Sequence, residues 1–187
     1  MPSPPHIFPG EVIAVTPAQG KLMEQAIDVS SYAIGPSKTF SPYSYSKDYL
    51  IPVPFNKNLH AHSVESIWQG LKVVSGVTDF TMFLKKPKKR RGIVQGHFAK
   101  ERLLDITDAR SLIYRPSYYY YLDNYVAELV KNKYLLRIIE DGVAFYDTED
   151  NTVIEDTTAP LAHSAYLADY FQDLLTSKKE KNGAPGI

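Results

Sequence analysis

The most informative stretch of this chain is Ser63-Val64-Glu65-Ser66-Ile67-Trp68-Gln69-Gly70-Leu71-Lys72. Read at about 100° per residue, it predicts a helix with two different stripes. The apolar stripe consists of Val64, Ile67, Leu71 and Val74, and the polar stripe of Glu65, Trp68, Gln69 and Lys72. A helix needs one apolar stripe to pack against a core. Folding does not require an acid, an amide and an amine beside the only tryptophan, so we expect function on the polar stripe.

The composition of the chain is that of an ordinary globular protein. Its 187 residues are 44% hydrophobic and 22% charged, which fits one domain with a core of its own. Basic and acidic residues both number 21, and this zero net charge argues against bulk binding to duplex DNA or to an anionic membrane. The absence of cysteine excludes disulfides and thiolate metal sites. Because we find no secretory signal and no apolar run of membrane-spanning length, we expect a cytoplasmic protein.

Helical and extended segments follow one another without a regular order, which predicts an α+β fold, mainly helical with a few short strands. We expect an extended, proline-rich arm over residues 1–10, a single domain over residues 11–176 and a disordered tail over residues 177–187. Strands or extended segments are predicted at residues 11–16, 26–30, 50–55 and 143–146. Helices are predicted at residues 18–25, 63–74, 102–114, 116–139 and 158–175.

A basic run, Lys-Lys-Pro-Lys-Lys-Arg-Arg-Gly, occupies residues 85–92 and is predicted to form a loop. A run of this kind is usually a solvated surface. In a chain of zero net charge, however, six cations in seven residues form a local positive pole that could hold the phosphates of a nucleotide. Lys89 and Arg90 are therefore candidate substrate-binding residues.

The histidines allow several readings. His60 and His62 would need a third ligand to hold a metal, and the chain has no cysteine to supply one, so we assign no metal and no cofactor. His97 follows the basic run and is either a core residue or a substrate contact. His163 lies early in the last predicted helix, on the side of Tyr166 and Tyr170, where the helix dipole disfavours added positive charge and an imidazole could relay a proton.

A tyrosine stripe, Tyr114, Tyr118, Tyr121 and Tyr125, follows the helix that begins near Pro116. Such a stripe usually belongs to the core. Tyr114 is nevertheless kept as a candidate substrate-binding residue, and Arg110 as one that could hold a phosphate. We find neither a glycine-rich phosphate loop nor a Gly-x-Ser-x-Gly nucleophile turn.

The chemistry of the polar stripe suits a sugar. A carboxylate such as Glu65 can stabilise an oxocarbenium-like transition state or orient water. A desolvated lysine such as Lys72 can attack a sugar aldehyde as a Schiff-base nucleophile. The alternative for both residues is an ordinary solvent-facing polar face.

The helix resembles the Ser-x-Glu-His-x-x-Gln-x-x-Lys helix of the NADAR (YbiA-like) superfamily. Phe40-Ser41-Pro42-Tyr43 is similar to the segment that precedes it there. Further resemblance, to that superfamily's later helices and to an uncharacterised bacterial and phage family with this fold, lies in Ile51-Pro52-Val53-Pro54-Phe55, Asp105, Ala109-Arg110, Ile113-Tyr114, Pro116, Leu122, Asn124 and Pro160-Leu161-Ala162-His163.

The resemblance implies an α+β fold and an N-glycosidase that cleaves the bond between a ribose and a base or an amine, without a cofactor. Substrates in the superfamily include ADP-ribosylated guanine and phosphorylated intermediates of the riboflavin pathway. Glu65, Gln69 and Lys72 match the superfamily's glutamate, glutamine and lysine. The sequence departs from the pattern at Ser66, where a histidine is usual, and at residues 160–163, where a Trp-Gly segment is usual.

Two functions follow as expectations. The first is an N-glycoside hydrolase for a ribosylated or ADP-ribosylated nucleotide-like substrate, with Glu65 and Lys72 at the anomeric carbon and His163, or an acid such as Asp147, protonating the leaving base. Its substrate-binding residues would be Tyr43, Trp68, Gln69, Lys89, Arg90, His97, Arg110 and Tyr114. The second is a non-catalytic module on the same scaffold that binds a nucleotide or a partner. Convergence of Glu65 and Lys72 in a cleft favours the enzyme, and a flat surface favours the module.

Overall fold

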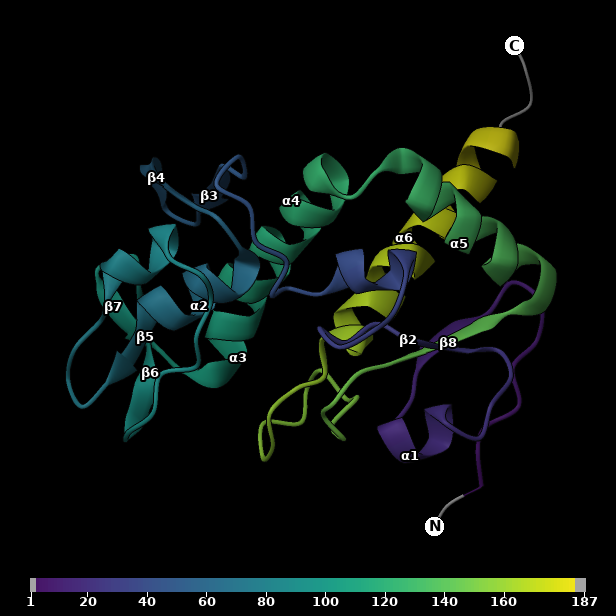
Figure 1. Cartoon of the computed structure of the whole chain (residues 1–187), viewed down its shortest axis with the longest axis horizontal. Coiled ribbons are helices and arrows are strands. Elements are labelled where there is room, and N and C mark those ends of the chain that lie inside the picture. Colours follow the sequence, from purple (N-terminus) through teal and green to yellow (C-terminus); the bar gives the residue numbers. More distant parts are fainter. Residues whose placement is uncertain (1–2, 184–187) are drawn as a thin grey trace. The chain divides into compact units, whose positions relative to one another are not determined.

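The structure, a computed structural model, describes residues 3–183 (Figure 1). The fold is α+β as predicted, with about 41% helix, 19% strand and three small sheets. The chain divides into two compact units. Unit 1 comprises Met1–Phe40 and Ala127–Ile187, and unit 2 comprises Ser41–Val126. The prediction of one domain over residues 11–176 stays a prediction.

Unit 1 is built on a parallel three-stranded sheet. Its strand order is β1 (Val12–Ala14), β8 (Val143–Tyr146) and β2 (Ala26–Asp28). The central strand β8 has the apolar sequence Val-Ala-Phe-Tyr, which suits a strand that is buried on both faces. The long helix α6 (His163–Gly183) packs against β1 and β8.

The remaining helices of unit 1 begin and end at recognisable signals. Helix α1 (Pro17–Gly20) begins with a capping box, in which Thr16 is the N-cap residue and Gln19 its partner. Helix α5 (Glu128–Asp141) ends at Gly142, whose φ of 74° suits glycine. An aromatic cluster fills the core, formed by Phe40, Tyr134, Phe145 and Phe171.

Unit 2 surrounds the helix α2 (Val64–Leu71) with two antiparallel sheets and several short helical turns. One sheet pairs β3 (Ile51–Val53) with β4 (Asn56–Ala61). The other has the order β5 (Lys72–Val74), β6 (Val94–Ala99) and β7 (Arg102–Leu104). The helical elements are the 3-10 helix η2 (Phe80–Leu84), α3 (Ile106–Ala109), the π-helical turn η3 (Arg110–Tyr114) and α4 (Arg115–Tyr125).

The predicted apolar stripe of α2 is buried. Val64, Ile67 and Leu71 belong to the core, and the Ser63 hydroxyl caps the helix by accepting a hydrogen bond from the Ser66 N–H at 3.1 Å. The helix is shorter than predicted, because the chain turns extended at Lys72 and enters β5. Pairing of β5 with β6 and the β-branched residues Val73 and Val74 favour the strand over three more helical residues.

Several predicted boundaries are wrong, and the reason is local pairing or packing. Residues 102–114 form β7, α3 and η3 in place of one helix, because β7 pairs with β6. The helix expected over residues 116–139 is interrupted at residues 126–127, and the segment 18–25 keeps only four helical residues. Strands β4 and β6 were not predicted. Helix α6 begins at His163 and runs to Gly183, into the segment expected to be disordered. Residues 1–2 of the expected arm and 184–187 of the expected tail lie outside the described residues.

Within the described chain, no helix combines the length and the apolar character that crossing a membrane requires.

Gly70 gives a direct test of how α2 packs. A Cβ at this position would collide with the ring of Phe83, which follows from the close approach of α2 and η2. Alanine normally stabilises a helix relative to glycine. Here we expect Gly70→Ala to lower the free energy of unfolding by about 1–3 kcal/mol through overpacking.

The measurement is chemical denaturation of Gly70→Ala, Phe83→Ala and the double variant. Relief of the collision should make the double variant more stable than the sum of the single effects implies. Additive effects would show that Phe83 does not restrict this position.

Candidate functional site

Most of the predicted site residues come together in unit 2, on and around the polar stripe of α2. Direct contacts join them into one cluster, which we call the α2 site: Tyr43, Glu65, Trp68, Gln69, Lys72, Arg90, His97 and Tyr114. The members come from the loop before α2, from α2 itself, from the basic loop, from β5 and β6, and from η3.

Glu65 is the most deeply buried charged residue of the α2 site, with 6% of its surface exposed. Its Oε1 accepts hydrogen bonds from Gln69 Nε2 at 2.7 Å and from the Tyr43 hydroxyl at 3.1 Å. Burial raises the pKa of Glu65, and the donors Gln69 and Tyr43 and the cations Lys72 and Lys89 oppose that shift. Glu65 therefore keeps its proton to a higher pH than an ordinary glutamate.

Lys72 is half-buried at the junction between α2 and β5. Burial lowers its pKa, and the cations Lys89 and Arg90 lower it further, while the Glu65 carboxylate opposes them. The two residues influence each other electrostatically, yet within the described chain they form no direct ion pair. Lys72 therefore has a larger neutral, nucleophilic fraction at a given pH than an ordinary lysine.

Aromatic rings line the neighbourhood of this pair. The half-exposed Trp68 ring lies on the His97 ring with centroids 3.7 Å apart and an interplanar angle of 35°. Tyr114 meets Trp68 edge to face at 5.5 Å. His97 is in turn the register partner of Lys72 across β5 and β6. Three predicted substrate-binding residues, Trp68, His97 and Tyr114, thus form one aromatic group next to the predicted nucleophile Lys72.

His97 is a buried imidazole, 2% exposed, and neither of its ring nitrogens has a hydrogen-bond partner of good geometry among the described residues. Burial and the nearby Lys72 lower the pKa of His97 to about 3, although the backbone of Trp68 partly opposes this shift. His97 is therefore neutral at physiological pH, and its nitrogens are the unsatisfied polar atoms of the α2 site.

The basic loop is attached to α2 at two points. The Ser66 hydroxyl donates to the Lys85 carbonyl at 3.0 Å, and the Arg90 N–H donates to Gln69 Oε1 at 2.9 Å. Ser66 thus has a structural role at the position where the resembled superfamily has histidine. Lys86, Lys88, Lys89 and Arg91 are exposed along the loop.

Arg90 and Arg110 have different surroundings from those that the sequence indicated. The Arg90 guanidinium binds backbone carbonyls, so it is occupied by the protein itself. Arg110 is 4% exposed and belongs to the same π-helical turn as Tyr114. No pattern in the sequence separates Arg90 from the other cations of its run, so its structural contacts could not be predicted.

His163 and Asp147 lie in unit 1 and bind each other. His163 Nδ1 is 2.6 Å from Asp147 Oδ2, and His163 Nε2 is 2.9 Å from the Val29 carbonyl. Burial would raise the pKa of Asp147, but His163 and the N–H groups of Glu149 and Ser164 hold it below its ordinary value. Asp147 is therefore a poor proton donor. Both ring nitrogens of His163 face acceptors within unit 1, and its catalytic role stays a prediction.

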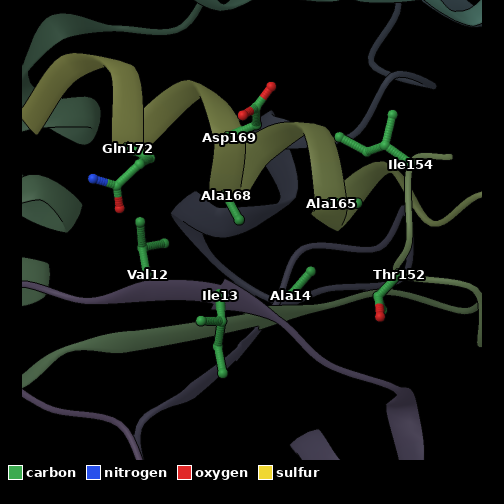
Figure 2. Close-up of a pocket in the computed structure, with 9 residues that line it drawn as sticks. All are labelled: Val12, Ile13, Ala14, Thr152, Ile154, Ala165, Ala168, Asp169 and Gln172. Carbon is green, nitrogen blue, oxygen red and sulfur yellow. The ribbon is translucent and has the colours of Figure 1, made fainter. Parts of the chain in front are cut away.

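Unit 1 also contains an apolar pocket of about 300 Å³ beside the edge strand β1 (Figure 2). Val12 and Ala14 point toward α6, and Ile13 points to the other side of the strand. Its lining consists of Val12, Ile13, Ala14, Thr152, Ile154, Ala165, Ala168, Asp169 and Gln172. No predicted site residue is among them.

The neutral state of His97 predicts a specific sensitivity to acid. The folded state binds a proton at His97 only near pH 3, whereas the unfolded state does so near 6.5. The stabilising effect of the neutral ring is thus fully present above pH 6.5 and is lost as pH falls toward 3, by up to about 1.4 kcal/mol per pH unit. Because neither nitrogen has a good partner within the described part of the chain, we expect His97→Phe to fold and to show a flatter decline of stability with falling pH.

The measurement is urea denaturation from pH 7.5 to pH 4, with His60→Phe as the control for an exposed histidine. Parallel declines in the His97→Phe variant and the parent protein would contradict the assignment.

The comparisons with known proteins give a family but no function. No curated protein and no solved structure matches the chain. Residues 18–167 match a family of unknown function, DUF6939, and this match includes every residue of the α2 site. The comparisons show no link to the NADAR superfamily, so that resemblance supports proposals only. Because the match covers most of the chain, the protein belongs to the family of unknown function DUF6939.

Proposed function

We propose that the protein is an N-glycoside hydrolase acting on a ribosylated or ADP-ribosylated nucleotide-like substrate at the α2 site. The observation that supports this most is the combination of a buried Glu65 with raised pKa and a half-buried Lys72 with lowered pKa. Paired titratable groups whose surroundings move their pKa values toward neutrality are typical of acid–base and nucleophilic sites. The resemblance to the NADAR helix supplies the reaction class.

Glu65 is suited to donate the proton that the leaving base needs. Its Oε1 faces the donors Tyr43 and Gln69, so in the protonated acid the hydrogen resides on Oε2. Among the described residues no hydrogen bond reaches Oε2, which can therefore turn to a substrate. After transfer to the base nitrogen, the carboxylate left behind stabilises the positive charge that develops at the anomeric carbon.

Lys72 is suited to attack that carbon. Its neutral amine forms a bond to C1 as the C1–N bond to the base breaks, and the base leaves with the proton from Glu65. Loss of one amine proton and opening of the sugar ring give an iminium, which water hydrolyses to the free sugar and the amine. The net reaction consumes one water and needs no oxidant, reductant or metal.

The rest of the α2 site offers recognition. Trp68 and Tyr114 present aromatic surface for a base, and His97 presents a neutral hydrogen-bonding ring. In this proposal the exposed cations of the basic loop bind a phosphate of the substrate, and what supports it is that Lys89 lies near enough to influence both Glu65 and Lys72.

The alternative is a non-catalytic module that binds a nucleotide or a partner on the same scaffold. The observation that favours it is the missing direct ion pair between Glu65 and Lys72 in the described chain. The two proposals differ in turnover and not in binding, so one assay separates them.

We expect Lys72→Ala and Glu65→Gln to lose turnover by at least about 100-fold, a typical loss for a group that acts in the transition state. Glu65→Gln keeps an acceptor for Tyr43 and Gln69, so its fold should persist. The measurement is release of ribose or ADP-ribose from ADP-ribosylated nucleic acid, ADP-ribosylated small molecules and ribosylated pyrimidines.

Borohydride added during turnover should trap a sugar on Lys72, visible as an added mass on its peptide. The control is Lys47→Ala, because Lys47 is an exposed lysine outside the α2 site. Full activity of Lys72→Ala on a substrate that the parent protein turns over would refute its catalytic role. Binding without turnover of any tested compound would favour the module.

The basic loop allows a separate test of phosphate binding. Replacing Lys88, Lys89 and Arg91 by glutamine, with Arg90 retained for its structural contacts, should weaken binding of ADP-ribose. The loss should be largest at low ionic strength, because salt screens contacts between exposed charges. Isothermal titration calorimetry at several salt concentrations measures the affinity of the variant and of the parent protein for ADP-ribose. Equal affinity of the variant and the parent protein at every concentration would show that the loop is only a solvated surface.

A further inference from the structure

Arg90 differs from the cations around it, because it makes four hydrogen bonds to backbone and side-chain acceptors within the described chain. Its backbone N–H donates to Gln69 Oε1 at 2.9 Å. Its Nη1 donates to the carbonyls of Gln69 at 3.1 Å and of Lys72 at 2.5 Å. Its Nη2 donates to the carbonyl of Val77 at 2.8 Å. These acceptors belong to the end of α2, the start of β5 and the turn after β5.

The first of these bonds determines which way the Gln69 amide faces. An N–H group can only donate, so the amide atom that meets Arg90 must be the oxygen. The amide nitrogen then necessarily points to the other side, where it donates to Glu65 Oε1 at 2.7 Å. The orientation of the hydrogen bond on Glu65 thus depends on the position of the Arg90 backbone.

The guanidinium bonds hold the junction from which Lys72 projects. The last carbonyls of a helix have no partner within the helix. Arg90 supplies donors to two carbonyls at this end, those of Gln69 and Lys72, and a planar guanidinium can serve both together with Val77. A lysine at this position would keep the charge but could not reproduce this fork of donors.

We propose that Arg90 is a positioning residue, which orients the Gln69 amide toward Glu65 and fixes the Lys72 backbone at the junction of α2 and β5. This assignment rests on the proposed function only for its consequence in turnover. The contacts themselves, and their effect on the reactivity of Lys72, hold for any chemistry at the site.

The effect on Lys72 can be measured without a substrate. Arg90 lies among the cations that lower the pKa of Lys72, and Arg91 does not. Competitive labelling with acetic anhydride, followed by mass spectrometry of peptides, gives the pKa and the reactivity of each lysine separately. The variants are Arg90→Gln, Arg90→Lys and the matched control Arg91→Gln, which removes the same charge from the next residue.

We expect Arg90→Gln to decrease the labelling rate of Lys72 near neutral pH by about threefold or more, because loss of a nearby cation raises the pKa of Lys72 and so decreases its neutral fraction. Arg91→Gln should leave Lys72 unchanged. Arg90→Lys should also decrease the labelling rate of Lys72. It keeps the charge but loses the guanidinium bonds that fix the Lys72 backbone, so the decrease reports those contacts. A Lys72 rate in Arg90→Lys equal to that of the parent protein would show that only charge matters and would overturn the positioning role. Equal rates in Arg90→Gln and Arg91→Gln would overturn it as well.

Thermal unfolding of each variant checks that it is folded, and Arg90→Lys serves where Arg90→Gln does not fold. Once a substrate is found, Arg90→Lys should lower kcat and shift its pH profile with little change in KM. Altered labelling without any turnover in the parent protein would reject the proposed hydrolase and leave the positioning role intact. Turnover by the parent protein, together with unaltered labelling of Lys72 in the Arg90 variants, would support the hydrolase and reject the positioning role.

Discussion

The side chain of Gln69 is the connection on which the α2 site depends. Its oxygen accepts from the Arg90 backbone and its nitrogen donates to Glu65, so one amide joins the basic loop to the buried carboxylate. A buried carboxylate with no donors would carry a large free-energy cost as an anion. Gln69 and Tyr43 reduce that cost without removing it, which leaves the pKa of Glu65 raised and not lowered. A cation at direct contact would have paired with the carboxylate and reversed the direction of the shift.

The polar stripe could be predicted from sequence because helical periodicity places i, i+3, i+4 and i+7 on one face. Glu65, Trp68, Gln69 and Lys72 obey that rule even though the helix ends one residue before Lys72. Tyr43, His97 and Tyr114 could be nominated from residue type and from resemblance, but their contacts with the helix depend on strand register and on the π-helical turn. Single-sequence periodicity carries no information on either. The same limit explains the errors over residues 102–114, where pairing of β7 with β6 overrides a helical pattern.

The basic run shows why composition alone misleads. Its residues look equivalent in the sequence, yet Arg90 binds carbonyls of α2 and its neighbours while Lys88 and Arg91 are exposed. The difference arises because helix α2 ends where a donor fork is needed, and the loop is already attached to the helix through Ser66 and the Lys85 carbonyl. A tethered loop loses less conformational entropy when it binds a phosphate than a free one does, because part of its freedom is lost on folding.

The α2 site concentrates groups that a fold selected only for stability would avoid. Glu65 and His97 are both buried with pKa values displaced in the direction of the neutral form, and both His97 nitrogens lack good partners among the residues that the structure describes. Replacing such groups by apolar residues of similar shape is often neutral or stabilising. Residues that lower stability, in a sequence that otherwise supports the fold, are expected at functional positions. Unit 1 contains the contrasting case: His163 and Asp147 are also largely buried, but each is bound by complementary partners. The contrast between the satisfied His163–Asp147 pair of unit 1 and the His97 nitrogens, which have no good partner among the described residues, is therefore the physical ground on which we propose function in unit 2.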